Sequence, residues 1–518
     1  MTTIDTTNLD GRTTLDGRTD GTMHAHRAGP REWAALAVLM LPVLMVSVDN
    51  TVLSFALPAI SVDLRPTGTQ LLWIVDLYAI MLAGLLVAMG SIGDRFGRRR
   101  LLLIGTVGFG AASLLAAYSH SAEMLLASRA LQGIFGATLM PSTLSLIRNV
   151  FHDPRDRRLA IASWAAMFSG GAALGPVLGG WLLGHASWGA VFLINVPLII
   201  VLVPLAIALL PESRDPSPGP LDLAAIGLSL LAMLPLVFGI KNVAEHGLTD
   251  LTLAAFAIGA VAAWAFVHRL RTSAAPMIDL TLFNNRVFNG AIIANLLSLM
   301  GLTGFLFLGA QLLQLVLGLS AMDAALVLLP GLVATVAAGF LAVRLVRFVS
   351  VRVLVTASFV ASATGYAITA LTEVPTVASV AIAFAVMGVG IGMAETLTND
   401  VMLSSVPSSK AGAASAISET AYEIGAVLGT AVLGTVLIST YRSHLTYPAI
   451  LQWGERDGSF ETLGGTVELA KHYPNEVGTN LLESARQAFD LGVQLTSGAA
   501  IVIALAAALV SWRTLKNA

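Results

Sequence analysis

Long apolar runs separated by short polar breaks constrain the fold of this chain more than any other feature. A helix needs about 20 mostly apolar residues to cross the hydrocarbon core of a bilayer. The 518-residue sequence has room for more than a dozen such runs, and its charged residues amount to only 12%, against roughly 25% in soluble domains. Because a backbone in lipid must satisfy its own hydrogen bonds, these runs predict an all-α polytopic membrane protein.

The breaks between the runs predict fourteen transmembrane helices. We place them at roughly 33–58, 70–90, 101–119, 123–147, 159–184, 188–210, 222–242, 251–268, 287–312, 322–345, 351–371, 376–400, 410–440 and 496–512.

The distribution of basic residues supports this count. With a cytoplasmic N-terminus, the breaks on the cytoplasmic side hold most of the 29 Lys and Arg residues. The opposite breaks hold Arg65, Lys241 and the basic residues of one long loop, 441–495. Short cytoplasmic loops are enriched in Lys and Arg, and an odd number of helices would reverse the asymmetry. Both termini are therefore predicted to be cytoplasmic.

A weak internal repeat suggests how the helices are grouped. The glycines 171, 175 and 179 of the fifth predicted helix recur as 425, 429 and 434 of the thirteenth. Repeats of this kind are typical of secondary transporters and predict a 6+2+6 arrangement. The predicted units are a disordered cytoplasmic tail 1–30, an N-terminal six-helix half 31–210, a linker with two extra helices 211–285, and a C-terminal half 286–518 that includes an extracellular loop 441–495. Within this loop, a short helix is expected at 480–491.

The string GGAALGPVLGG, residues 170–180, lies within the fifth apolar run. Glycines four residues apart lie on one helix face and allow a neighbouring backbone to approach closely. A proline inside a helix removes one backbone hydrogen bond. The string therefore predicts a helix that packs tightly and bends. The residues concerned are Gly171, Gly175, Pro176, Gly179 and Gly180.

Three other strings occur at fixed places relative to the predicted helices. The first helix ends in VDNTVLSFALP, the loop after the second reads GSIGDRFGRRR, and the fourth carries SRALQGIFGA. Together with the glycine string, they resemble the fourteen-helix drug:proton antiporters of the major facilitator superfamily, in particular QacA-type and LfrA-type multidrug exporters. In the loop, the residues that match the family's cytoplasmic gate motif are Gly90, Asp94, Arg95, Gly97 and Arg98.

The resemblance implies a function and its partners. It implies a multi-pass protein of the bacterial cytoplasmic membrane that exports lipophilic cationic drugs, dyes and antiseptics by alternating access, driven by protons. It implies no cofactor, no metal, no nucleic acid and a monomer among membrane lipids. In the gate motif, Asp94 is expected to accept hydrogen bonds at a facing helix end, and the arginines to hold anionic lipid and the opposite half. Some QacA-like exporters carry an acid where this chain has Thr335, so the handling of dications is open.

Three charged residues lie within predicted helices of the N-terminal half. Asp49, Asp76 and Arg129 reach similar depths when each residue rises 1.5 Å. Embedded charge is costly, so these residues are expected to form an acid–base cluster for proton coupling, with Asp49 and Arg129 as the central pair. The alternatives are an ion pair that only locks helices together and, for Asp76, solvation at the interface beside Trp73.

Further acids lie within predicted helices of the C-terminal half. Glu419 and Glu423 are four residues apart and share one helix face, and Glu395 and Asp400 lie on the preceding helix. Embedded carboxyl groups without a base can exchange protons near neutral pH and can also hold an organic cation. We expect Asp76, Glu395, Glu419 and Glu423 to bind the substrate. Asp400 approaches the cytoplasmic end and is expected to be solvated.

Other functions compete with drug export. No nucleotide-binding loop, metal-ligand cluster or nucleophile–base pair is present, which disfavours an enzyme. A solute importer of the same fold would share the gate motif but would not need the glycine string. An exporter of lipid or cell-wall precursors would need a similar wide cavity with acids, and the sequence does not separate it from a drug exporter. A membrane scaffold would need no embedded carboxylates.

Overall fold

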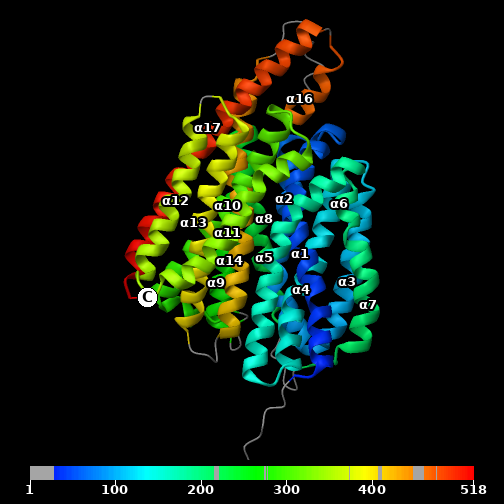
Figure 1. Ribbon diagram of the computed structural model, residues 1–518, viewed down its shortest axis with the longest axis vertical. Helices are drawn as coiled ribbons and strands as arrows, with labels where there is room; N and C mark the ends of the chain where they lie inside the picture. Colours follow the sequence, from blue (N-terminus) through cyan, green and yellow to red (C-terminus); the bar gives the residue numbers. More distant parts are fainter. Residues whose placement is uncertain are drawn as a thin grey trace, which may run out of the picture.

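The computed structural model describes residues 28–214, 221–273, 276, 278–372, 374–406, 411–446, 460–473 and 475–517. Within these residues, fourteen helices are long and apolar enough to cross a membrane, which confirms the number predicted from the apolar runs. They form one elongated all-helical bundle (Figure 1). Most of the predicted disordered tail, residues 1–27, lies outside the described part of the chain.

The first eight spans are separated by short connections. They are α1 (Pro30–Asp63), α2 (Gly68–Phe96), α3 (Arg98–Ala117), α4 (Ala122–Val150), α5 (Pro154–His185), the short α6 (Ala190–Leu193) with α7 (Asn195–Leu209), α8 (Leu223–His246) and α9 (Asp250–Thr272).

The remaining spans follow a 3-10 turn, η1 (Leu280–Asn284), and two of them contain π-helical segments. They are α10 (Arg286–Gln311) with η2 (Leu312–Val316), α11 (Ala321–Leu345), α12 (Val351–Leu371), α13 (Val377–Ser404), α14 (Ala411–Leu428) with η4 (Gly429–Gly434) and α15 (Thr435–His444), and α17 (Asn475–Thr514), which is preceded by α16 (Leu463–Ala470) and followed by η7 (Leu515–Asn517).

Because successive spans alternate in direction, the bundle has two ends. We call the end where α1 begins the Pro30 end. The other end, where α1 finishes and α2 begins, is called the α16 end because α16 lies over it (Figure 1). There, the amide of Gly68 donates a hydrogen bond of 2.9 Å to Glu461 Oε2, just before α16. This contact joins the start of α2 to a segment almost four hundred residues away.

The glycine string of α5 packs as its spacing predicts. A Cβ atom added at Gly171 would lie 2.9 Å from Ser47 of α1, and one added at Gly179 would lie 2.8 Å from Val52 of the same helix. One added at Gly175 would overlap Thr51. At Gly180, on another face of α5, the added atom would lie 2.7 Å from Met322 Cα of α11. The string therefore holds α5 between α1 and α11.

The same pair of contacts recurs in the second half of the chain. Added Cβ atoms at Gly425 and Gly429 would collide with α10, and one at Gly434 would meet Leu72 of α2. Thus α14 and η4 lie between α10 and α2, as α5 lies between α1 and α11. The repeated glycines detected in the sequence therefore mark repeated helix contacts.

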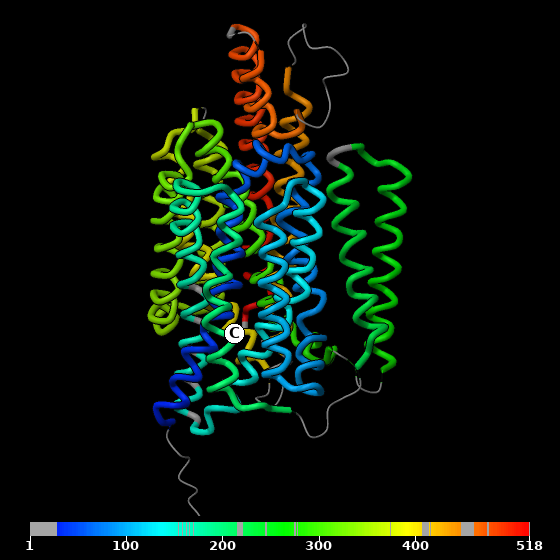
Figure 2. Tube along the Cα trace, turned by 90° about the vertical axis from the view of Figure 1, so that its right-hand side faces the viewer, coloured from blue at the N-terminus to red at the C-terminus, as the bar shows by residue number. Residues whose placement is uncertain are grey.

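Helices α8 and α9 form a hairpin at the side of the bundle, visible as the separate green pair in Figure 2. The hairpin packs against α2, where a Cβ atom added at Gly84 would overlap the side chain of Leu230 of α8. Ser229 Oγ donates a hydrogen bond of 3.3 Å to the carbonyl oxygen of Gly84. The hairpin is thus attached to the bundle through α2.

The segment predicted as the long loop 441–495 is largely helical where the structure describes it. The last helix begins at Asn475 rather than near 496, and the short helix expected at 480–491 is part of it. A helix of 40 residues is about 60 Å long, twice the thickness of the hydrocarbon core. Its first half therefore extends beyond the α16 end, together with α16 (Figure 1). Because this half is polar and amphipathic, the apolar runs did not predict that it is continuous with the last span.

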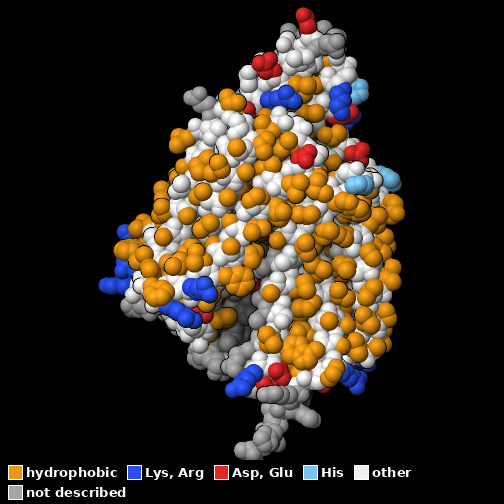
Figure 3. Space-filling model, in the orientation of Figure 1, with side chains coloured by type: hydrophobic (Ala, Val, Ile, Leu, Met, Phe, Trp, Pro, Cys, Tyr) orange, Lys and Arg blue, Asp and Glu red, His pale blue; other side chains and the backbone are white. Residues whose placement is uncertain are grey.

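The bundle is closed at its α16 end and hollowed toward its Pro30 end. At the α16 end, Gln314 Nε2 donates a hydrogen bond of 3.2 Å to the carbonyl oxygen of Phe55, which joins η2 to α1. The Gly180–Met322 contact lies at the same end, near the end of α5 and the start of α11. Figure 3 shows a hollow between the helices on the left and right of the lower part of the molecule.

We predict that Gly175→Leu destabilises the protein through this packing. The new side chain must displace α1, because even a Cβ atom overlaps Thr51, and overpacking of this kind costs about 1–3 kcal/mol. Gly170→Leu is the matched control, since no atom lies within 4 Å of its added Cβ. Thermal unfolding of the purified variants in detergent should show a lower midpoint for Gly175→Leu alone. Equal midpoints for the two variants would show that α5 and α1 do not rely on this contact.

Candidate functional site

A cavity of about 710 Å³ lies between the two sets of helices. It is lined by α1, α2 and α4 on one side and by α10, α14 and η4 on the other. Its aromatic lining includes Tyr78, Phe307 and Tyr422, and its charged lining consists of Asp76, Arg129 and Glu423. An apolar, aromatic cavity with few charges suits an organic cation.

Asp49 and Arg129 form the ion pair that the sequence predicted. Arg129 Nη1 donates to Asp49 Oδ2 at 2.7 Å, and both side chains are at most 2% exposed. The guanidinium also donates to the Ile74 carbonyl oxygen at 3.2 Å and to Gln132 Oε1 at 2.9 Å. It lies 4.5 Å from the ring centroid of Tyr78. Arg129 therefore ties α4 to α1 and α2 at the wall of the cavity.

Asp76 lines the same cavity but does not join this pair. Its Oδ2 lies 2.8 Å from Lys241 Nζ of α8, and both side chains are fully buried. The ammonium group also lies 4.1 Å from the ring centroid of Trp73. The expected three-residue cluster is thus two separate ion pairs, and Asp76 is not solvated at the interface.

The position of Lys241 corrects the sequence analysis, which placed this residue in a polar break. Lys241 is 0% exposed and lies within the membrane span 223–243. The prediction failed because the residues that follow it are polar and resemble a loop. A signal was present: Asp76 is an embedded acid that needed a basic partner.

The predicted acids of the C-terminal half occupy different environments. Glu423 lines the cavity and is 3% exposed, whereas Glu395 and Glu419 are half-buried and Asp400 is exposed. Within the described residues, no Lys, Arg or His forms an ion pair with Glu395, Glu419 or Glu423. The cavity therefore brings together Glu423, Asp76 and Arg129 from helices far apart in the sequence.

Thr335 does not replace an acid in this cavity. Its hydroxyl donates to the carbonyl oxygen of Gly331 at 3.0 Å, and its backbone packs on Gly392 of α13. The residue therefore belongs to the α11–α13 interface.

Among the described residues, the side-chain hydrogen bonds of the gate motif are formed within the motif and with the start of the linker, and not with the opposite half as expected. Asp94 accepts hydrogen bonds of 2.9 and 2.7 Å from Arg98. Arg98 also donates to Ser213 Oγ at 3.1 Å, and Glu212 accepts from the amide of Arg99 at 3.2 Å. The chain turns between α2 and α3 at Gly97, whose φ of +116° favours glycine.

The other two motif residues make fewer contacts. Arg95 is exposed at the Pro30 end. A Cβ added at Gly90 would lie 3.7 Å from Pro141 of α4, an ordinary packing distance. The hollow at this end separates the motif from the described residues of the opposite half.

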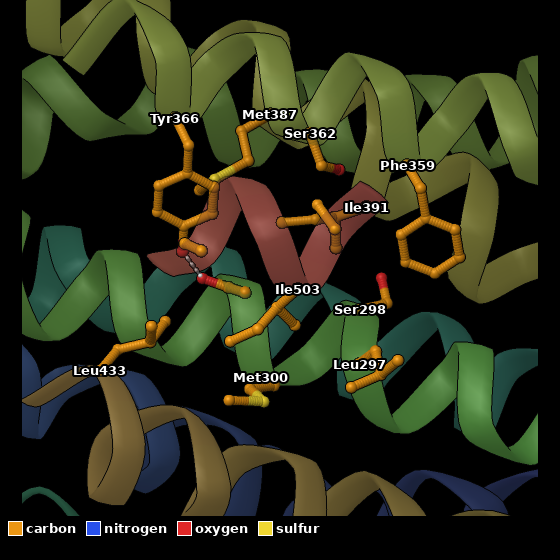
Figure 4. A pocket seen from close by; sticks show the side chains of 13 residues that line it. Leu297, Ser298, Met300, Phe359, Ser362, Tyr366, Met387, Ile391, Leu433 and Ile503 are labelled. Atoms are coloured by element: carbon orange, nitrogen blue, oxygen red, sulfur yellow. Dashed lines mark hydrogen bonds between the residues drawn. The ribbon is translucent and has the colours of Figure 1, made fainter. Parts of the chain in front are cut away.

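A second cavity lies within the C-terminal half, among α10, α12, α13 and α17, and has a volume of about 330 Å³. Figure 4 shows its apolar lining and the hydrogen bond from Tyr366 to the carbonyl oxygen of Gly301. None of the described residues that line it is charged. It therefore offers no counter-ion for a cation, and the cavity between the halves is the better candidate site.

Comparisons with known proteins agree with this geometry. The Major Facilitator Superfamily model matches residues 39–430. The chain is 51% identical to the multidrug efflux pump LfrA of Mycolicibacterium smegmatis over 492 residues, which cover 95% of this chain and 98% of that protein. It is 36% identical to the methyl viologen resistance protein SmvA of Salmonella typhimurium over 493 residues, 94% of this chain and 99% of that protein.

A solved structure shares the fold. A bacterial homologue of the human lysosomal transporter Spinster, in an inward-facing and unoccupied conformation, superposes with a TM-score of 0.66. The match covers 94% of this chain and 98% of the other at 18% sequence identity. At this identity the likeness shows the fold alone.

We predict that Asp49 and Arg129 depend on each other for stability. Asp49→Asn leaves a buried guanidinium without its counter-ion, which should cost about 3–5 kcal/mol. Adding Arg129→Gln should restore most of the loss. Asp222→Asn is the control, because Asp222 pairs with an arginine that is 51% exposed and such pairs contribute about 0–1 kcal/mol. Denaturant unfolding in detergent of the wild type, Asp49→Asn, Arg129→Gln, the double variant and the control tests the coupling. Additive losses in the double variant would mean that the pair is not coupled.

Proposed function

This chain belongs to the Major Facilitator Superfamily, and we propose that it is a proton-coupled antiporter that exports lipophilic cations by alternating access. The names of its relatives support drug efflux as the activity. The charges inside the cavity support cations as the cargo and protons as the coupling ions.

One observation carries this proposal. Glu423 is buried in the wall of the central cavity and has no basic partner among the described residues. An unpaired carboxylate in such a place is costly unless a proton or a cation neutralises it. Glu423 therefore binds either a proton or the cationic cargo, and this competition is the basis of exchange. Tyr422 and Phe307 add aromatic faces for the cation.

The arrangement of the helices supports a direction of transport. The basic residues of the gate motif lie at the Pro30 end, which we assign to the cytoplasm by the positive-inside rule. The hollow at this end then opens to the cytoplasm, while the closed α16 end faces outward. In this state Glu395 and Glu419 are half-buried on the way to Glu423. Cargo enters from the cytoplasm and displaces a proton.

The repeated glycine contacts fall into two groups, those that must break during transport and those that persist. The Gly180 contact of α5 with α11 and the Gly434 contact of η4 with α2 both cross between the halves at the closed end. Opening to the outside must separate them, while the contacts of α5 with α1 and of α14 with α10 stay within each half. This division supports the 6+2+6 arrangement, with the α8–α9 hairpin as the two extra helices.

The ion pair of Asp49 and Arg129 is assigned to proton coupling. A proton on Asp49 would release Arg129, which is held by Ile74 and Gln132 as well. Because these partners belong to α2 and α4, protonation changes how α1 is bound to its neighbours. We therefore expect Asp49→Asn to remain inserted in the membrane but to lose proton-driven efflux.

We predict that cells expressing the protein expel ethidium and that a protonophore abolishes this efflux. Glu423→Gln should lower the initial efflux rate by on the order of tenfold, because the cargo loses its counter-ion in the cavity. Asp400→Asn is the control, since Asp400 is exposed and its loss should leave the rate unchanged. Efflux that survives the protonophore, or equal rates in both variants, would contradict the proposed function.

We also predict that the exchange uses more protons than the cargo has charges, because Glu395 and Glu419 are further carboxyl groups beside Glu423. A surplus proton makes the cycle electrogenic, and about 100 mV then contributes roughly 2.3 kcal/mol per extra charge. In proteoliposomes without a pH gradient, an imposed potential should move ethidium in the export direction. Transport driven by a pH gradient but not by a potential would show an electroneutral exchange.

A further inference from the structure

The α8–α9 hairpin brings a positive charge to a carboxylate that lines the cavity. Lys241 of α8 is fully buried, and its ammonium group lies 2.8 Å from Asp76 Oδ2 and 4.1 Å from the Trp73 ring centroid. The hairpin packs on α2 through the Gly84 contacts. Lys241 thus contacts Asp76 from behind the helices that line the cavity.

Asp76 and Glu423 face one cavity from opposite halves of the bundle. They are the only carboxylates among its described lining residues, and the third charged group, Arg129, is already neutralised by Asp49. Lys241 neutralises Asp76, whereas no base neutralises Glu423 among the residues described. The enclosed cavity therefore has one uncompensated carboxylate, which matches one positive charge on the cargo.

Resting on the function proposed above, we propose that Lys241 is a tethered counter-ion that withholds Asp76 from the cargo and so limits the cavity to singly charged cations. A dication would bring a second charge out of water, and Glu423 is the one unpaired carboxylate among the described residues that line the cavity. Such desolvation is costly without a counter-ion. Apart from Lys241, the described side chain that interacts with the Asp76 carboxylate is the uncharged Thr430. Removal of Lys241 would therefore leave this carboxylate without a cationic partner and so able to bind a second cationic centre.

The alternative is that the pair only fastens the hairpin to α2. A fastening role predicts that loss of Lys241 weakens stability and lowers transport of every cargo alike. A counter-ion role predicts a change in the preference for cargo charge. The two roles are therefore separated by comparing cargoes of one shape and different charge.

Two probes meet this requirement. Methyl viologen carries two methylated pyridinium rings, and its phenylpyridinium analogue has the same two-ring shape with one methylated nitrogen. Binding of each probe to the purified protein in detergent gives the charge preference without transport. Ethidium efflux in cells, measured in parallel, reports whether the proposed export function holds.

Three variants test the role of Lys241. Lys241→Met removes the charge and keeps the chain length, Lys241→Arg keeps the charge, and Asp76→Asn with Lys241→Met removes both charges. Without Lys241, the Asp76 carboxylate would attract the second cationic centre of a bound dication at an effective dielectric constant of about 20. Because protons compete for the same carboxylate, we expect the gain in binding affinity to be on the order of tenfold. We expect Lys241→Met alone to bind methyl viologen about tenfold more tightly relative to its analogue. The arginine and double variants should keep the wild-type preference.

Several results would overturn the proposal. One is an unchanged preference in a Lys241→Met protein that still expels ethidium. Another is a gain in methyl viologen binding that persists in the double variant, because Asp76 would then not be needed. If Lys241→Met does not fold, the two probes are compared on the wild-type protein. The proposal requires that the wild type binds methyl viologen no more tightly than the analogue, and tighter binding of methyl viologen would overturn it. Absence of ethidium efflux by the wild type would instead count against the export function.

Discussion

The structure depends on how charge is neutralised inside a membrane. A charged side chain in the hydrocarbon region must find a partner of opposite charge, a proton or water. Two acids of the N-terminal half form ion pairs with bases: Asp49 pairs with Arg129, and Asp76 pairs with Lys241. The nitrogen–oxygen distances are 2.7 Å and 2.8 Å. In the C-terminal half, Glu423 has no such base among the described residues. The two walls of the cavity thus differ: one is internally neutral, and the other requires a mobile cation.

This asymmetry links the fold to the proposed exchange. Glycine contacts hold α5 on α1 and α14 on α10, and in the proposed cycle each half moves as a unit. The contacts of Gly180 and Gly434 cross between the halves at the α16 end, where the bundle is closed. A transport cycle needs these crossing contacts to break while the internal ones persist. The two ion pairs lie on the side of the cavity formed by α1, α2 and α4, and Glu423 lies on the opposite side, on α14.

Sequence reasoning predicted the features that depend on local pattern. Apolar runs predicted the fourteen spans, and the spacing of Gly171, Gly175 and Gly179 predicted close packing on a neighbouring helix. Shared depth predicted the Asp49–Arg129 pair. Features that depend on distant partners were missed. Lys241 lies beside polar residues and resembles part of a loop, and only Asp76, far away in the chain, accounts for its burial. In the polar first half of α17, a short helix was expected at 480–491, but its continuity with the last span was missed because this half is amphipathic rather than apolar.

The central claim is that cargo and proton compete for Glu423, and proton release on binding tests it most directly. Purified protein in weakly buffered detergent solution near neutral pH is titrated with ethidium while the pH is recorded. Linkage between binding and protonation predicts about one proton released per ethidium bound by the wild type, and close to none by Glu423→Gln. Ethidium binding to the wild-type protein without release of protons would contradict the account.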